Sequence, residues 1–158
     1  MLPFPSDDVP LSPDGAALAR GVLRLFHDLG YSALLEFPLG IGRRADVAGI
    51  RRDGTVAIAE VKSCLADYRT DKKWADYVGF CDLFYFAVPR DFPRDVLPAD
   101  TGLIIADRFG GQVARPAPAS APLAAARRKA LTLRFARTAA YRLSAAHDPG
   151  VPLVQDLD

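Results

Sequence analysis

The strongest constraint on the fold is an Asp53-Gly54 pair between two strand-like segments, residues 46–52 and 55–63. An Asp-Gly pair in this setting is typical of a β-hairpin turn, because glycine adopts positive φ at little cost. We therefore expect two antiparallel strands joined by a short loop, with the rest of the fold built around them.

The length of this loop decides which side chains face each other. With a two-residue turn, Asp46 would lie opposite Val61, and the carboxylates of Asp46 and Glu60 would point to opposite faces of the sheet. With a three-residue loop, residues 52–54, Gly54 is left-handed and the register shifts by one. This second register brings together the larger apolar residues and the two acids, so we predict it. It produces three facing pairs: Ile50 with Val56, Ala48 with Ile58, and Asp46 with Glu60.

The remaining segments alternate between helical and strand patterns. A first helix is expected to begin with Ser12 as N-cap and Pro13 at its first position, and to stop at Gly30. The other predicted elements are a strand at 33–39, a helix at 65–82, a strand at 83–88, a turn at 91–97, a strand at 103–106, a Pro/Ala linker at 115–122 and a helix at 122–146. This order predicts an α/β fold with a mixed sheet. The length of 158 residues predicts one domain, with a core at about 12–110.

The charge is unevenly distributed, although Lys and Arg number 20 against 19 Asp and Glu. Residues 119–147 contain no acid, and their basic residues are Arg127, Arg128, Lys129, Arg134, Arg137 and Arg142. The spacing of Arg127, Arg134 and Arg137 predicts one basic stripe on the last helix, which could contact a polyanion such as DNA. The alternative is a helix that docks on the body with its charged face in water.

Several classes of protein are excluded by pattern. No segment has the roughly 18 uninterrupted apolar residues of a membrane span. The first residues carry acids and prolines where a signal peptide needs a basic start and an apolar run, so we expect a cytoplasmic protein. Phosphate-binding and nucleophile-elbow glycine motifs are also missing.

The residues that point to chemistry lie on the second strand of the hairpin. The chain has two glutamates and four lysines, yet Glu60-Val61-Lys62 combines them at the end of a strand. Period-two geometry puts Glu60 and Lys62 on one face, where the predicted register also places Asp46. Two carboxylates beside an amine form a site for a hard cation, Mg²⁺ or Mn²⁺, and Glu36 is a third candidate ligand. A structural ion pair at a sheet end, with Glu36 an ordinary outward residue, is the alternative.

These residues resemble the PD-(D/E)xK nuclease superfamily and, more narrowly, the MmcB-like DNA repair family. Four blocks carry the narrower resemblance: R-R-A-D-V at 43–47, A-E-V-K-S at 59–63, D-K-K-W-x-D-Y at 71–77 and C-D-L-F-Y-F-A-V-P at 81–89. The resemblance covers about residues 12–145. It implies a restriction-endonuclease-like core and a metal-dependent phosphodiesterase that acts on DNA in damage repair.

Within this resemblance, Asp46 and Glu60 match the metal-binding acids and Lys62 matches the catalytic lysine. Ala45 stands in place of the superfamily's proline. The early acid often found on the first helix has no clear counterpart here, so Glu36 on the following strand is the substitute candidate.

Further basic residues near the site are candidates for contacts with DNA. Lys73 is predicted to reach the scissile phosphate from the middle of the helix at 65–82, with Lys72 as the alternative. Arg43 and Arg44 flank Asp46 and could contact backbone phosphates, or could simply be solvated at a strand entry. Trp74, on the same predicted helix, is expected to face the core.

Two functional hypotheses follow. The first is a metal-dependent DNA nuclease, or a nuclease-like protein, of DNA repair, in which Lys62 assists the attacking water. The second is a non-catalytic DNA- or protein-binding module that retains the fold. The expected partners are DNA and other repair proteins, one of which could dock on the basic C-terminal helix.

Overall fold

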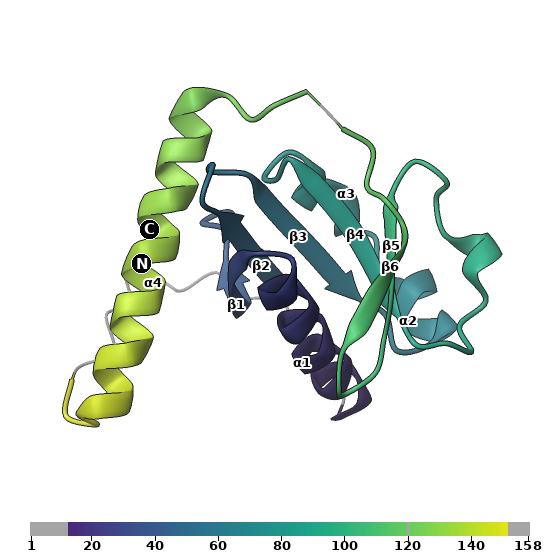
Figure 1. The fold of residues 1–158 in the computed structure, drawn as a ribbon, viewed down its shortest axis with the longest axis horizontal. Coiled ribbons are helices and arrows are strands. Elements are labelled where there is room, and N and C mark those ends of the chain that lie inside the picture. Colours follow the sequence, from purple (N-terminus) through teal and green to yellow (C-terminus); the bar gives the residue numbers. More distant parts are fainter. Residues whose placement is uncertain (1–12, 120, 152–158) are drawn as a thin grey trace.

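The fold is a mixed six-stranded sheet with helices on both faces, seen in a computed structural model that describes residues 13–119 and 121–151 (Figure 1). The strands are β1 (Tyr31–Pro38), β2 (Arg44–Arg51), β3 (Val56–Val61), β4 (Leu83–Val88), β5 (Gly102–Ala106) and β6 (Gly111–Arg115). The helices are α1 (Pro13–Asp28), α2 (Leu65–Thr70), α3 (Trp74–Val78) and α4 (Ala125–His147), with a 3₁₀ turn at Arg94–Val96. The predicted α/β class with a mixed sheet is confirmed.

Strand order follows the chain from β1 to β6. The first three strands pair antiparallel, β3, β4 and β5 pair parallel, and β6 returns antiparallel to β5. A parallel neighbour requires a crossover connection, and α2 and α3 supply it between β3 and β4. The carboxyl ends of β3 and β4 therefore lie at the same edge of the sheet, next to the start of α2.

Two apolar clusters hold the layers together, one on each face of the sheet. On the first face, α1 packs Leu18, Val22 and Phe26 against the strands, as the helical spacing requires. On the second face, Ile58 and Phe86 are fully buried, and side chains from the α2, α3 and α4 segments cover them. Figure 1 shows α1 crossing one face while α4 stands beside β1 and β2.

The central hairpin has the predicted three-residue loop. Ile50 pairs with Val56 and Ala48 with Ile58. The N–H of Arg51 donates to the carbonyl of Thr55 (2.9 Å), which leaves residues 52–54 as the loop, and Gly54 has a φ of 86°. In this register, Glu60 on β3 and Asp46 on β2 belong to the same face of the sheet.

The predicted helix at 65–82 is wrong as a single element. The chain forms two short helices, α2 and α3, and leaves helical geometry at Asp71, which is extended (φ −81°, ψ 113°). The hydroxyl of Thr70 donates to the carbonyl of Ala66 at 3.0 Å, so a side chain supplies a hydrogen bond to one of the last carbonyl groups of α2. The carboxylate of Asp71 binds Lys62 and the N–H of Lys73, and these contacts end the helix there.

Other boundaries differ by smaller amounts. β6 was missed, because its residues, Gly111–Arg115, lack an apolar alternation and are mostly exposed or half-buried. The C-terminal helix begins at Ala125 and ends at His147, close to the prediction. Ser12, the expected N-cap of the first helix, lies outside the described residues.

The C-terminal helix is attached to the body through its arginines. Arg128 donates to both carboxylate oxygens of Asp82 (2.7 and 2.8 Å) and to the carbonyl of Gly54 (2.8 Å). The bonds from Arg128 lower the pKa of Asp82 to about 2. Further along, Arg142 donates to the carbonyls of Leu35 and Glu36. The charged face of α4 thus meets polar backbone at the edge of the sheet.

Among the described helices, none combines the length and the apolar character needed to cross a bilayer.

Replacing Arg128 by alanine should loosen the start of α4, because Asp82 loses its two-pronged partner. We expect a loss of about 1 kcal/mol in the free energy of unfolding, since the pair is partly exposed. Amide hydrogen exchange in the first turns of α4 should also become faster. The matched control is Arg137→Ala on the same helix, whose side chain is exposed. Equal destabilisation by the two variants, in denaturant titrations, would contradict this role for Arg128.

Candidate functional site

Asp46 and Glu60 meet where the β2–β3 ladder ends. The last regular pair of this ladder is Val47 with Ala59, so the next pair in register is Asp46 with Glu60. The Asp46 carboxylate accepts a hydrogen bond from the N–H of Val61 (2.8 Å), and the N–H of Asp46 donates to the carboxylate of Glu60 (3.3 Å). Side-chain oxygens therefore replace main-chain carbonyls at this point, and both acids are fixed by backbone donors.

Burial makes this acid pair electrostatically costly. Glu60 is 4% exposed, and its neighbour in register on β4 is the buried ring of Phe86. Burial raises the pKa of Asp46 to about 6, although bonds from Val61 and Glu60 and the charge of Lys62 oppose the rise. Burial and the nearby charge of Asp46 raise the pKa of Glu60 well above its usual value. The pair therefore favours a proton or a cation.

Lys62 follows β3 directly and places an ammonium group beside the acids. Its N–H donates to the carbonyl of Ala87 (2.9 Å), which extends the parallel ladder by one residue. The Nζ atom lies 2.7 Å from a carboxylate oxygen of Asp71, and both side chains are largely buried. Burial alone would lower the pKa of Lys62, but the bond to Asp71 and the charge of Glu60 outweigh it and raise the pKa. The amine therefore stays protonated at neutral pH.

Asp71 is a member of the site that was not among the predicted site residues. One of its carboxylate oxygens binds Lys62, and the other accepts from the N–H of Lys73 (2.7 Å), the N-cap of α3. A continuous helix could not place both contacts, so the break between α2 and α3 and the position of Lys62 have one cause. The sequence signal was its place at the start of the D-K-K-W-x-D-Y block at 71–77.

The two candidate lysines of the crossover segment lie in the break rather than in a helix. Lys72 is exposed, whereas Lys73 is half-buried and precedes the first turn of α3. Trp74 faces the core as predicted, with its ring 5.2 Å from that of Phe86. The assignment of either lysine to the scissile phosphate stays a prediction, and its premise of a mid-helix position is wrong.

Arg43 and Arg44 tie the start of β2 to its neighbours. Arg43 pairs with Asp76 of α3 (3.2 Å). Arg44 pairs with Glu36 (3.7 Å), and its carbonyl accepts a bond from the hydroxyl of Tyr77 (3.1 Å). Both guanidinium groups are partly exposed and lie beside the acid pair in sequence, so contacts with DNA stay a prediction for them.

Glu36 lies level with Asp46 in the sheet but outside the acid pair. Its φ of 49° is in the left-handed region, and the strand turns over there, because Leu35 and Phe37 pack in different clusters instead of sharing a face. The exposed carboxylate pairs with Arg44. Among residues 13–119 and 121–151, no three Asp, Glu, His or Cys side chains gather closely enough to hold a metal ion. Ligation by Glu36 would require its side chain to move.

The basic stripe of α4 is divided between the protein and solvent. Arg127 donates to the carbonyl of Gly79 (2.9 Å) and covers the ring of Phe80. Arg134 lies against Gly40, where an added Cβ would come within 2.3 Å of its guanidinium. Arg137 is exposed. The arrangement agrees with the docked-helix alternative for Arg127 and Arg134, while DNA binding by the stripe stays a prediction.

Comparison with known families assigns the chain. The family model described as DNA repair protein MmcB-like matches residues 3–150. This protein belongs to the MmcB-like family of DNA repair proteins. A search of curated proteins gives no significant match.

Two solved structures are similar to this MmcB-like protein to different degrees. A protein of unknown function from Silicibacter pomeroyi, SPO1766, is 41% identical, with a TM-score of 0.86, over 93% of this chain and 100% of that one. A repair endonuclease from Pyrococcus abyssi is 18% identical, with a TM-score of 0.36, over 52% of this chain and 40% of that one. The second likeness is too weak to inform the function of this chain.

The acid pair fits a small hard cation. Mg²⁺ is often held by only one or two carboxylates, because it keeps several waters and takes further oxygens from a substrate phosphate. Asp46 and Glu60 supply two carboxylates that backbone donors already orient, and their raised pKa values mean that a cation would relieve their repulsion. The donors are oxygens throughout, as Mg²⁺ and Mn²⁺ prefer.

The pH dependence of stability tests this electrostatic description. An acid whose pKa is raised by folding binds its proton more tightly in the folded state, so the fold loses stability as the pH rises through that pKa. With EDTA present, we expect the free energy of unfolding to fall as the pH increases from 3.8 to about 6 and beyond. Asp46→Asn should flatten this pH dependence. Above neutral pH, the free energy of unfolding of the variant should be about 1–2 kcal/mol higher than that of wild type.

Urea titrations across this pH range provide the measurement. Asp95→Asn, at an exposed position in the 3₁₀ turn, should retain the wild-type profile. Parallel curves for wild type and Asp46→Asn would contradict the description of a coupled acid pair.

Proposed function

We propose that this protein is a divalent-cation-dependent deoxyribonuclease of DNA repair that hydrolyses phosphodiester bonds. The observation that carries the proposal is the convergence of Asp46 and Glu60 at the end of two strands, with the ammonium of Lys62 beside them. Membership of a DNA repair family supports DNA as the substrate.

In this proposal Asp46 and Glu60 hold Mg²⁺ or Mn²⁺. When bound, such an ion can acidify a water and neutralise charge that develops on the phosphate. The protein prepares the site in advance, because the Val61 N–H fixes one carboxylate and the Asp46 N–H fixes the other. Little reorganisation is then needed when substrate arrives.

Lys62 is assigned the role of a fixed positive charge. Asp71 keeps the amine protonated, so Lys62 is poorly suited to remove a proton from water at neutral pH. A protonated amine can instead donate hydrogen bonds that orient the attacking water or stabilise negative charge on a phosphate oxygen. Asp71 acts through Lys62 and is a positioning residue.

DNA would be held by basic groups around this edge of the sheet. Arg43, Arg44 and Lys72 are at least partly exposed near the acid pair, and Arg137 is exposed on α4. Contacts of this kind position the backbone without reading sequence.

The second candidate function is a non-catalytic DNA- or protein-binding module of DNA repair. The deep burial of Glu60, together with the position of Glu36 outside the pair, favours it, because these features reduce the number of accessible ligands. The two candidates differ in whether Asp46 and Glu60 bind a divalent ion.

Calorimetry with Mn²⁺ separates the two candidates. We expect wild type to release heat on binding Mn²⁺ and Asp46→Asn to lose most of it, because one of two ligating carboxylates is removed. Glu36→Gln is the matched control and should bind like wild type, since its carboxylate lies on Arg44. Equal heats for wild type and Asp46→Asn would rule out a metal site at the acid pair and favour the non-catalytic binding module.

Cleavage assays test the roles of Lys62 and Asp71. With single-stranded, duplex, nicked and branched DNA, Lys62→Gln should lower kcat by about 10²–10³-fold, the usual cost of losing one electrostatic donor. Asp71→Asn should cause a smaller loss that grows at alkaline pH, because the pKa of Lys62 falls without its partner. Lys129→Gln, at an exposed position on α4, should have no effect. A pH-independent loss in Asp71→Asn would mean that Asp71 is only structural.

A further inference from the structure

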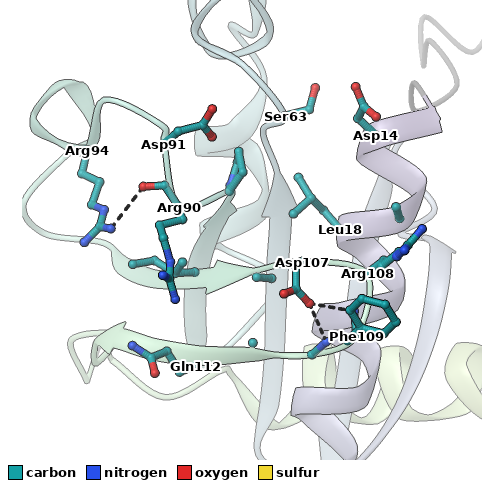
Figure 2. Close-up of a pocket in the computed structure, with 16 residues that line it drawn as sticks. Asp14, Leu18, Ser63, Arg90, Asp91, Arg94, Asp107, Arg108, Phe109 and Gln112 are labelled. Atoms are coloured by element: carbon teal, nitrogen blue, oxygen red, sulfur yellow. Dashed lines mark hydrogen bonds between the residues drawn. The ribbon is translucent and has the colours of Figure 1, made fainter.

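A large open groove lies at the edge of the sheet where β3 ends, on the face that α1 covers. It lies between the start of α1, the loop after β4 and the β5–β6 hairpin, and we call it the hairpin groove (Figure 2). Ser63, the residue after Lys62, lines it. Its volume of about 1160 Å³ exceeds the range typical of small-ligand pockets, roughly 300–1,000 Å³. A groove of this size suits part of a chain molecule better than a compact small ligand.

Three arginines line the hairpin groove, and sequence reasoning had assigned none of them. Arg90 and Arg94 come from the loop after β4, and Arg108 comes from the turn of the β5–β6 hairpin. Within the described part of the chain, none of these three guanidinium groups has a carboxylate at ion-pair distance. In this respect they differ from Arg128, which Asp82 neutralises.

The turn of the hairpin holds an aromatic ring in solvent. Phe109 is 66% exposed, and the guanidinium of Arg108 lies 4.7 Å from its ring centre. Its backbone is fixed, because its N–H donates to the carboxylate of Asp107 (2.7 Å) and its carbonyl accepts from Arg24 of α1 (3.3 Å). The guanidinium thus lies over one face of the ring, and the two side chains stand together at the rim of the groove (Figure 2).

Tight packing below the turn keeps this surface in place. A Cβ added to Gly21 would come within 1.7 Å of the carbonyl oxygen of Asp107, so α1 and the hairpin touch through their backbones. Phe109 is therefore exposed on a tightly packed turn, because the residues on either side of it contact α1.

Three aspartates also line the groove: Asp14, Asp91 and Asp107. The Asp107 carboxylate accepts bonds from the N–H groups of Phe109 and Gly110 and is thus used by the turn. Figure 2 shows Arg90 and Arg94 beside Asp91 on one side of the groove and Arg108 with Phe109 on the other, with Asp107 between them. Positive groups therefore lie on both sides of the groove.

We propose that the hairpin groove binds single-stranded DNA at the sheet edge that also carries the proposed cleavage site, with an unpaired base stacked on Phe109 and phosphates held by Arg90, Arg94 and Arg108. This inference rests on the proposed function and specifies the form of DNA that the site accepts. Stacking on an exposed ring needs unpaired bases, because bases in a duplex are already stacked on their neighbours. Guanidinium groups without acidic partners suit backbone phosphates.

Fluorescence anisotropy with EDTA present tests the groove without cleavage. The probes are a labelled oligothymidine of about 12 nucleotides and a duplex of the same length. Wild type should prefer the single strand. Phe109→Ala should weaken that binding roughly tenfold, in line with the loss of one stacked base, and should change duplex binding little. Arg94→Gln should reduce the salt slope for the single strand by about 0.7, one phosphate contact.

Matched controls lie elsewhere on the surface. Leu133→Ala removes an apolar side chain that is 55% exposed on α4, and Arg52→Gln removes an exposed arginine at the far end of the β2–β3 hairpin. Both should bind oligothymidine like wild type. Because Phe109 and Arg94 are exposed, their variants are expected to fold.

Two results would overturn the inference: preference of wild type for the duplex, or unchanged oligothymidine binding in both Phe109→Ala and Arg94→Gln. If cleavage still requires Asp46 in that case, the proposed function stands and only the groove assignment fails. If oligothymidine binds through Phe109 but Mn²⁺ gives neither heat nor cleavage, the groove binds single strands and the nuclease proposal fails.

Discussion

The structure depends on the register of the β2–β3 hairpin, because that register forces two carboxylates together at the end of a buried ladder. Ile50 pairs with Val56 and Ala48 with Ile58, and the next facing pair on this side is Asp46 with Glu60. Apolar pairs inside the sheet stabilise the register, and the acids at its end are carried along by it. The free energy needed to bring these charges together comes from the core, not from the site.

The groups around Asp46 and Glu60 offset only part of the repulsion between the two carboxylates. Backbone N–H groups bind the carboxylates, and the ammonium of Lys62 lies beside them, yet burial still raises the pKa values of both acids. Lys62 is itself committed to Asp71. A buried charge cluster left with unrelieved repulsion is typical of a binding or catalytic site, where a ligand completes the balance.

Arginine serves two different purposes in this protein. On α4, Arg128 and Arg142 bind the body of the molecule, so a helix that carries net positive charge is held by hydrogen bonds to a carboxylate and to carbonyls. Around the hairpin groove, Arg90 and Arg94 have no ion pair within the described residues. The distribution of charge along the sequence therefore indicates α4 as the DNA-binding surface. The ion pairs of the individual arginines instead favour the hairpin groove.

The sequence alone determined the α/β class, the hairpin register and the convergence of Asp46 and Glu60. These features follow from local rules, namely turn chemistry and the period-two alternation of a strand, and such rules act between residues close in the chain. Tertiary structure decided the rest. The break at Asp71, the reversal of the strand at Glu36 and the groove beside Phe109 all depend on contacts between different elements of the fold. Periodicity cannot anticipate a helix that ends because its next residue binds a lysine from another element, since that energy lies outside the helix itself.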